Sequence, residues 1–410
     1  MSELYTDAAL QAGSGRRTRQ SVRMQTIVTT SQPHDLLALV PQLVGFRPQN
    51  SLVLVAFNGK RTCGAYRVDL PEPASDSAYK RMATTLIGML CKVRGADGVI
   101  PVIYTDDRFD ECGGIPRETF AMIMLGRART AGFAVKDALC VAPDGWGSYF
   151  DDPDAVDQPR TLAMIDESSA HASIPDHERA ALRSPQERAE LPSVDLARRE
   201  RIGRAVAQLR TESAGESAHS GNNGAAARVG DIDSLFDAWE GLVAFAEVAL
   251  RLEGATISPD LAAQIMLTAD CPSLRDVLLF DWAWGRDIGL RTYRLNQRHT
   301  RGELITTEDD GALGLAGIGM PRPDPERIAT AIELLRHLAA CAPKSVRAPL
   351  LTMLAWLHWA LGSGSTAGLF VAQAQKIDPR YGLAELLGSM LQNGMLPEWS
   401  FDQVAAPSGR

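Results

Sequence analysis

The sequence predicts an α/β domain with a mixed, partly parallel sheet, followed by an all-α domain. Three observations support this prediction. Up to residue 150, short apolar runs of strand length alternate with amphipathic helical patterns. From residue 231 onward, apolar residues recur at helical spacing only. Six of the seven tryptophans lie at or after residue 239, so the second part has the residues for a hydrophobic core of its own.

The clearest local element is a β-hairpin in the first domain. Residues 51–57 form a continuous apolar run, and the Asn58-Gly59 dipeptide that follows is suited to a tight turn with positive φ. The returning strand is expected over 62–70, because Pro71 stops it.

The other elements of this domain follow from periodicity and from turn residues. Helices and strands in alternation imply crossover connections and therefore parallel strand pairs. Pro101 inside a strand suggests a sheet edge or a bulge. The expected elements are a strand starting at 27–28, a helix at 36–44, a helix at 76–93, a strand at 98–104, a helix at 116–131, a strand at 135–141 and an aromatic turn at 144–149 that covers the sheet edge.

Residues 151–230 differ in composition from both neighbouring parts. This stretch has no Phe, Trp, Tyr, Cys or Lys, and it carries ten Arg against fourteen Asp and Glu. Without aromatic residues it has little apolar area to offset the loss of chain entropy on folding. We therefore expect a polar, partly helical connector, with short charged helices near 176–190 and 194–209 and a flexible linker over 211–230.

The helical domain is expected over 231–400. Leu235, Trp239 and Leu242 lie on one face of a predicted helix, and Asp324-Pro325 is suited to the N-terminus of another. The glycines of 311–319 predict a flexible loop. The remaining segments are a predicted α/β domain at 26–150, a disordered arm at 1–25 and a tail at 401–410.

The end of the helical domain resembles one tetratricopeptide unit. A Gly- and Ser-rich connection at 362–365 joins two apolar helical segments, and small residues recur at Ala367 and Ala374 in the second. Only one unit is visible, whereas a solenoid needs at least three. The pattern therefore predicts a helical-hairpin packing module, with a peptide-binding repeat surface as the alternative.

Composition narrows the classes of function. The net charge of −8 and the pI near 5.5 give no general attraction to nucleic acid or to anionic membranes. Only six of the 42 basic residues are Lys, and we attribute this excess of Arg to the codon bias of a GC-rich genome. Six widely spaced cysteines form no CxxC pair, and no apolar stretch has the length of a signal peptide or a membrane span. We expect a cytoplasmic protein with reduced thiols and no membrane association.

A candidate small-molecule site lies beside the hairpin. Asp106 and Asp107 directly follow a predicted strand, and ligand sites in α/β sheets form beyond the carboxyl ends of parallel strands. Arg47 precedes the hairpin, and Arg67 with Asp69 lies in its second strand. The carboxylates could hold a hard cation, and the arginines an anionic ligand. The alternatives are a solvated acidic loop and a structural ion pair.

The sequence contains no persuasive catalytic constellation. The seven histidines form no HExxH or comparable pair, the serines lack a nucleophile-elbow context, and neither a P-loop nor GxGxxG occurs. His358, between Leu357 and Trp359, is expected in the core or an interface. We therefore assign no cofactor and no metal ligand, and the sequence leaves open whether the protein is an enzyme.

Several segments together resemble a known family. Near the start they are the runs from Pro33 to Pro41, from Leu43 to Pro48, from Ser51 to Val53 and from Arg67 to Pro71; near the end they are Ala348 to Leu351, Ala355-Trp356, Trp359 and Ala367 to Pro379. These segments are similar to a bacterial family of uncharacterised proteins, the domain of unknown function numbered 4192. The resemblance covers nearly the full chain. It implies the two-part architecture and no particular activity, cofactor or catalytic residue.

Two hypotheses for function follow. The first is a non-enzymatic interaction or scaffold protein that binds a protein partner through the helical domain, as the terminal helical hairpin and the tryptophans suggest. The alternative is a small-molecule-binding or hydrolytic enzyme that uses Asp106, Asp107, Arg47 and Arg67, with Asp69 beside Arg67. Nucleic-acid binding ranks third, because the acidic balance of the chain disfavours it.

Overall fold

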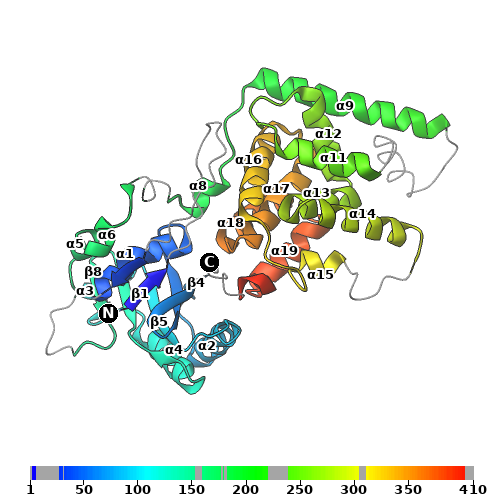
Figure 1. The fold of residues 1–410 in the computed structure, drawn as a ribbon. Helices are drawn as coiled ribbons and strands as arrows, with labels where there is room; N and C mark the ends of the chain where they lie inside the picture. Colours follow the sequence, from blue (N-terminus) through cyan, green and yellow to red (C-terminus); the bar gives the residue numbers. More distant parts are fainter. Residues whose placement is uncertain are drawn as a thin grey trace. The chain divides into compact units, whose positions relative to one another are not determined.

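The computed structural model describes residues 2–5, 27–30, 32–152, 159–176, 179, 182–219, 239–303 and 311–401. The chain divides into two compact units, of which the first spans Met1–Ser184 and Phe401–Arg410 and the second spans Pro185–Ser400. Figure 1 shows the sheet and its helices in the first unit, and helices in the second. The predicted fold class is confirmed: a mixed sheet with helices precedes a helix-rich region.

An eight-stranded sheet forms the centre of the first unit. Its order is β2-β1-β4-β3-β5-β7-β8, and β6 pairs with β5. The strand β5 is antiparallel to β3 but parallel to β6 and β7, so the sheet is mixed. The strands are β1 (Ser2–Tyr5), β2 (Ile27–Thr30), β3 (Ser51–Asn58), β4 (Arg61–Asp69), β5 (Gly98–Tyr104), β6 (Ala134–Val135), β7 (Leu139–Ala142) and β8 (Gly145–Ser148).

The predicted hairpin is confirmed as β3 and β4. Their antiparallel register pairs Ser51 with Asp69 at the open end and Asn58 with Arg61 at the turn. Gly59 has a φ of +57°, the left-handed conformation that glycine adopts without a steric penalty. Its amide also donates to the carboxylate of Asp97 at 2.9 Å, which ties the turn to the segment before β5.

Pro101 lies in a central strand, so the expected edge position is wrong. The strand β5 has β3 on one side and β6 and β7 on the other. The parallel pairing reaches Val99 opposite β6 and resumes at Val102 opposite β7. Pro101 therefore faces the break between these two short strands, where its missing N–H removes no ladder hydrogen bond.

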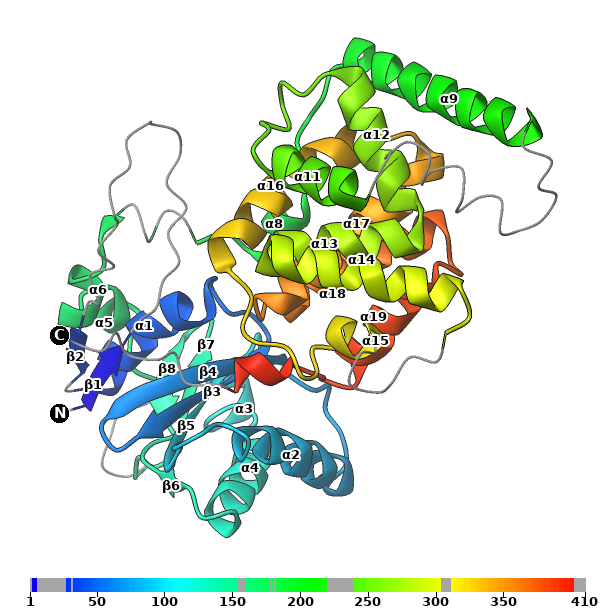
Figure 2. The same ribbon diagram turned by 45° about the vertical axis from the view of Figure 1, so that its right-hand side comes forward.

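Helices cover both faces of the sheet (Figure 2). The helices α2 (Asp76–Leu90) and α4 (Glu118–Thr130) pack on the face that carries Leu52 and Leu54. The helices α1 (Pro33–Val44), α5 (Ala163–Asp166) and α6 (Ser169–Ala172) pack on the face of Val53 and Val55. Alternate residues of β3 thus enter different cores, as the two-residue period of a strand requires.

The expected aromatic turn at 144–149 is wrong in conformation. Residues 145–148 form β8, antiparallel to β7, and the side chains of Trp146 and Tyr149 are buried. The strand expected over 135–141 is divided into β6 and β7. Both differences arise where two- to four-residue strands are stabilised by their neighbours, which a single-strand pattern does not reveal.

Helices make up the second unit. Among them α17 is buried on all sides: Val346 and every residue from Ala348 to Ala360 are buried. The helices are α8 (Pro185–Ala189), α9 (Leu196–His219), α11 (Trp239–Leu250), α12 (Pro259–Asp270), α13 (Pro272–Trp284), α14 (Arg286–Thr300), α15 (Gly311–Leu315), α16 (Pro325–Cys341), α17 (Lys344–Ala360), α18 (Gly364–Ile377) and α19 (Gly382–Gln392), with a short 3₁₀ turn at Glu398–Ser400.

The helices α17 and α18 pack as a hairpin, and α19 packs on α18. Ala367 and Ala374 of α18 are fully buried, which permits a close approach of the helices. Phe370, on the same helix, stacks on His358 of α17 with ring centroids 5.5 Å apart. The closer likeness of this hairpin to a tetratricopeptide unit stays a prediction.

Several expected segments differ from the structure or lie outside its described residues. The helix α9 continues to His219, beyond the end expected at 209, and α15 occupies part of the loop expected at 311–319. The helices α8 and α9 of the predicted connector belong to the second unit, whereas α5 and α6 belong to the first. Most of the N-terminal arm, the linker from 220 to 230, Leu235 and the tail after 401 lie outside the described residues.

Candidate functional site

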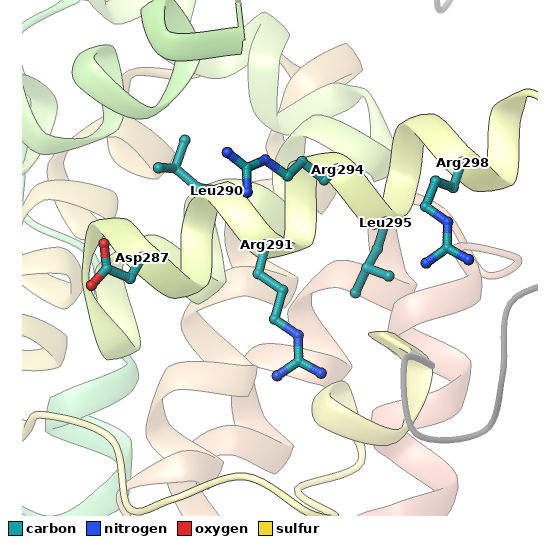
Figure 3. A pocket seen from close by; sticks show the side chains of 6 residues that line it. All are labelled: Asp287, Leu290, Arg291, Arg294, Leu295 and Arg298. Atoms are coloured by element: carbon teal, nitrogen blue, oxygen red, sulfur yellow. The ribbon is translucent and has the colours of Figure 1, made fainter.

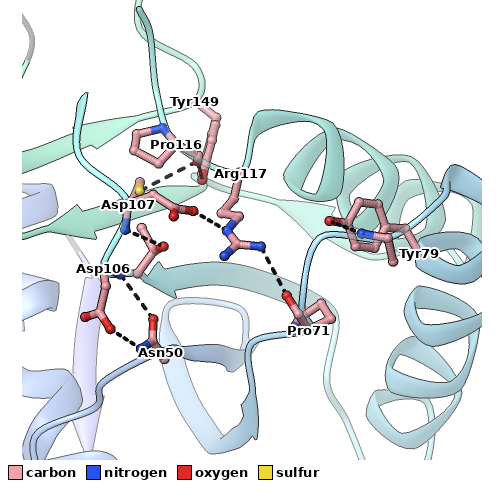
Figure 4. Close-up of polar contacts among 11 residues, drawn as sticks. Asn50, Pro71, Tyr79, Asp106, Asp107, Pro116, Arg117 and Tyr149 are labelled. Carbon is pink, nitrogen blue, oxygen red and sulfur yellow. Dashed lines mark hydrogen bonds and ion pairs between the residues drawn. The ribbon is translucent and has the colours of Figure 1, made fainter. Parts of the chain in front are cut away.

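The carboxyl ends of β5 and β7 lie at one edge of the sheet. The start of β3 and the end of β4 lie at the same edge, because Ser51 pairs with both Tyr104 and Asp69. This is the edge at which open α/β sheets bind ligands. We use the term strand-end site for four side chains gathered here: Asn50, Asp106, Asp107 and Arg117 (Figure 4).

Asp106 is held by Asn50. The Asn50 side-chain amide donates to the Asp106 carboxylate, and the backbone N–H of Asp106 donates to Asn50 Oδ1 at 3.1 Å. Asn50 has a φ of +41°, a conformation that asparagine tolerates better than most residues. The amide of Asn50 therefore joins the segment before β3 to the loop after β5.

Asp107 is held by Arg117. Arg117 Nε donates to Asp107 Oδ2 at 2.5 Å, and another guanidinium nitrogen donates to the carbonyl of Pro71 at 3.2 Å. Arg117 caps the N-terminus of α4 with a φ of +62°. Asn50 and Arg117 are the non-glycine residues with positive φ in the described part of the chain, and each binds one of the two adjacent carboxylates. Such backbone conformations cluster at ligand sites in proteins.

Arg67 and Asp69 form a separate pair. Their side chains are 2.5 Å apart, and Arg67 Nε donates to Ser51 Oγ at 2.8 Å. Arg67 pairs across the hairpin with Val53, whose side chain lies in the core beneath α1, whereas Asp107 bonds the N-terminus of α4 on the other face. Arg47 is exposed after the end of α1. Of the predicted site residues, Arg67 and Asp69 thus pair with each other, whereas Asp106 and Asp107 are held by Asn50 and Arg117.

Hydrogen bonds also hold the acidic loop after β5 in place. Asp144 accepts from the N–H groups of Phe109 and Asp110, both at 3.2 Å, and thereby caps the short helix α3 (Phe109–Cys112). Asp110 bonds Arg108. The described residues include no group of three His, Cys, Asp or Glu side chains placed to hold a metal ion.

The thiols near this edge are held in their neutral form. Burial raises the pKa of Cys140 to about 12, and slight desolvation together with the nearby carboxylates of Asp107 and Glu111 raises the pKa of the exposed Cys112. Tyr149 Oη donates to the carbonyl of Pro116 at 2.6 Å, and burial raises its pKa well above 10. None of these groups is activated as a nucleophile, because a reactive thiol needs a lowered pKa.

A second candidate site lies on α14 in the helical unit. A pocket with a volume of about 540 Å³ is lined by residues of this helix, and we use the term α14 pocket for it. Arg291, Leu295 and Arg298 extend from the same side of α14, with Leu295 between the two guanidinium groups (Figure 3). The lining residues are Asp287, Leu290, Arg291, Arg294, Leu295 and Arg298.

The helix α14 is anchored on its other side. Asn296 Nδ2 donates to the carbonyl of Ser273 at 2.7 Å, and Thr292 is buried against the unit. Arg298 Nε contacts the Glu303 carboxylate at 3.0 Å, and Asp287 is one of the lining residues. The six lining residues of the pocket thus include three arginines, two leucines and one aspartate.

Two signals in the sequence could have indicated these residues. Arg291, Arg294 and Arg298 recur at intervals of three and four, which places them on one face of a helix. The attribution of the arginine excess to codon bias does not consider this spacing. Asn50 and Arg117 each follow within two residues of a proline, but the contacts with Asp106 and Asp107 depend on the sheet register.

Comparison with known proteins supports a family but no activity. In the described parts of the chain, no helix has both the length and the hydropathy needed to cross a membrane. No curated protein and no solved structure matches the chain. The family model described as Domain of unknown function (DUF4192) matches residues 33–302 and 311–398, a span that includes both candidate sites. The chain therefore belongs to the DUF4192 family.

Proposed function

We propose that this chain is a non-enzymatic interaction protein that binds a protein partner through its helical unit, at α14. The observation that supports this proposal is the α14 pocket, a volume of about 540 Å³ that three arginines, two leucines and one aspartate of α14 line. Arginine beside apolar side chains is a combination enriched at protein interfaces.

The strand-end site gives weaker support to an enzyme. Asp107 is paired with Arg117, Asp106 with Asn50, and Arg67 with Asp69. A general base or a metal ligand would have to leave these partners before it could act. The free thiols of all six cysteines fit a reducing compartment, and we include the cytoplasm in the proposal on that ground.

Site-specific photo-crosslinking in the full chain tests the proposal. A benzophenone amino acid replaces the exposed Asp287 on α14, and the matched control replaces Met122, which is 42% exposed on α4 of the first unit. We expect a discrete protein adduct from position 287 in native lysate and none from position 122. Equal adducts from both positions, or no adduct from position 287, would contradict binding at α14.

A second candidate function is binding or hydrolysis of a small molecule at the strand-end site. The observation that favours it is the pair of strained residues, Asn50 and Arg117, beside two carboxylates. A thermal-shift screen of divalent metals, nucleotides and metabolites tests it, with the Asp106→Asn/Asp107→Asn double variant as the comparison. A ligand that stabilises the wild type but not this variant would support the enzyme. Equal shifts in both proteins would count against it.

A further inference from the structure

We infer that Asp281 is a proton-controlled latch between α13 and α14: its protonated carboxyl holds the first turns of α14 in place, and its ionisation lets them open more often. The latch is the contact of this carboxyl with Gly289 of α14. The inference rests on the proposed function, because it specifies how binding at the α14 pocket is regulated.

The Asp281 carboxyl lies at the corner between the two helices. Its side chain is fully buried near the C-terminus of α13, and Oδ2 has no hydrogen-bond partner in the described structure. A Cβ added to Gly289 would lie 2.9 Å from this oxygen, so the α14 backbone lies against the carboxyl. A protonated carboxyl fits this closed position, whereas an ionised one has to regain hydrogen bonds from water or from another donor.

The charges around Asp281 do not balance its ionised form. Arg327 Nη2, on α16, donates to Glu247 Oε1 at 2.6 Å but to Asp281 Oδ1 at 3.4 Å. One guanidinium therefore serves two carboxylates, and the shorter bond goes to the one on α11. The exposed Arg286, at the start of α14, is the other cation that acts on Asp281. The helices α12 and α17 also pack on α13, but no described charged group of theirs acts on this carboxyl.

The protonation equilibrium of Asp281 is therefore shifted to neutral pH. Burial and the Glu247 charge raise its pKa to about 7, against the opposing effects of Arg327 and Arg286. In the open state the carboxyl is hydrated, and its pKa returns toward about 3.9, the ordinary value for aspartate. Because the closed state has the higher pKa, its stabilisation is complete at low pH and is lost as the pH rises through about 7. From pH 6 to pH 8, the ratio of open to closed α14 thus increases about tenfold.

The opening reaches the α14 pocket. Gly289 directly precedes Leu290 and Arg291, two of the lining residues. The later part of α14 has an anchor of its own, because Asn296 Nδ2 donates to the carbonyl of Ser273 at 2.7 Å. The latch therefore controls the N-terminal part of the pocket, and a partner binds more tightly at pH 6 than at pH 8.

Hydrogen–deuterium exchange of the full chain, followed by mass spectrometry, tests the inference from pH 5.5 to pH 8. Exchange times are scaled for the pH dependence of the chemical exchange rate. We expect the amides of residues 287–293 to exchange faster than those of α17 at every pH, because α14 opens without global unfolding. Their protection factors should fall about tenfold between pH 6 and pH 8, with a midpoint near 7.

Three variants assign the response. Asp281→Asn keeps the shape of the side chain but cannot ionise, so its protection factors should be the same at pH 6 and pH 8. Glu247→Gln removes the charge that, with burial, raises the pKa of Asp281, and the midpoint should move below pH 7. This second variant decides the question even if Asp281→Asn does not fold. The matched control, Asp260→Asn, removes an exposed carboxylate of α12 and should keep the wild-type profile.

The results that overturn the inference are distinct from those that overturn the proposed function. A wild-type profile that is flat from pH 6 to pH 8, or a wild-type response in Asp281→Asn or an unmoved midpoint in Glu247→Gln, overturns the inference. Equal protection of α14 and α17 also overturns it, because α14 would then open only in global unfolding.

Crosslinking from position 287 separates the two proposals. The yield of the protein adduct should fall between pH 6 and pH 8, and an equal yield at both values overturns the regulation of binding. A discrete adduct together with a flat exchange profile leaves the proposed function standing without the latch. No adduct at either pH, together with the expected exchange profile, overturns the proposed function and supports the latch.

Discussion

At the scale of single residues, Arg117 connects three segments that are distant in the sequence. Its guanidinium bonds the Asp107 carboxylate and the Pro71 carbonyl, and its backbone begins α4. The side chain is largely buried, so these bonds are shielded from solvent more than those of a surface pair. The left-handed backbone of Arg117 is kept because these contacts offset its conformational cost.

We expect Arg117→Ala to lower the free energy of unfolding by about 1–3 kcal/mol, since the variant leaves Asp107 and the Pro71 carbonyl without a donor. The matched control is Arg108→Ala, which removes an exposed pair with Asp110 and should cost less than Arg117→Ala. Urea denaturation followed by circular dichroism measures both. Equal losses would mean that the Arg117 bonds contribute no more than a surface ion pair.

Asp281 makes the stability of the second unit depend on pH. Its side chain is fully buried, and burial together with the neighbouring Glu247 raises its pKa to about 7, against the opposing effect of Arg327. The folded state therefore favours the protonated acid. The resulting stabilisation is complete below a pH of about 4 and is lost as the pH rises through about 7.

The Asp281→Asn variant isolates this effect. Between pH 4 and pH 8, the free energy of unfolding of the wild type should fall by about 1–3 kcal/mol more than that of the variant. His358, whose pKa burial lowers to about 3, works in the opposite sense, because its contribution is lost as the pH falls below about 6.5. Since His358 is present in both proteins, their difference reports Asp281. Parallel pH curves for the two proteins would exclude this role.

At the scale of elements, the segment after α15 packs its backbone closely against Pro397 and Trp359. Gly317 has a φ of +74°, and a Cβ at this position would lie 2.6 Å from Pro397 Cβ and 2.8 Å from Trp359 Cη2. Gly319, two residues later, has a similar φ of +70° but open space around it. The two glycines therefore separate the cost of backbone conformation from the cost of a steric clash.

We expect Gly319→Ala to cost about 1 kcal/mol, the penalty for a left-handed conformation in alanine. Gly317→Ala should cost about 1–3 kcal/mol more, because the added methyl group overlaps Pro397 and Trp359. Thermal unfolding monitored by tryptophan fluorescence can compare the two variants. If both lose the same stability, the packing around Gly317 accommodates a methyl group and the predicted clash is wrong.

The elements differ in how far the sequence could predict them. The β3–β4 hairpin follows from an apolar run and Asn58-Gly59, and α17 from apolar residues on every side. In contrast, β8 consists of Gly145 to Ser148 and is a strand only because β7 pairs with it. The contact of Asn50 with Asp106 joins residues 56 positions apart and requires the β3–β5 register. Local patterns carry no information on such a register, so the strand-end carboxylates were predicted without their partners.

At the scale of the whole molecule, each unit has cores of its own. Leu52 lies in the core between the sheet and the helices α2 and α4, and Leu354 lies at the centre of the helical core around α17. Both side chains are fully buried. The described members of each core come from a single unit, which predicts that the units unfold in separate steps.

We expect calorimetry of the full chain to resolve two unfolding transitions. Leu52→Ala and Leu354→Ala each remove a buried side chain of the same size and should each cost about 2–5 kcal/mol in the unit that contains it. Each variant should therefore lower one transition temperature and leave the other unchanged. A single transition that both variants shift would show that the two units unfold as one.

Phe401 belongs to the first unit but is translated after the second unit. Its ring stacks on Tyr66 at 6.2 Å, and the Lys92 ammonium lies 5.5 Å from its ring centroid, so this residue completes a core whose other described members precede residue 185. A ribosome makes the whole second unit before it makes this phenylalanine. During that interval the nascent sheet carries Tyr66 without its aromatic partner. The first unit is translated first. Its contact between Tyr66 and Phe401 nevertheless forms only after the rest of the described chain has been translated.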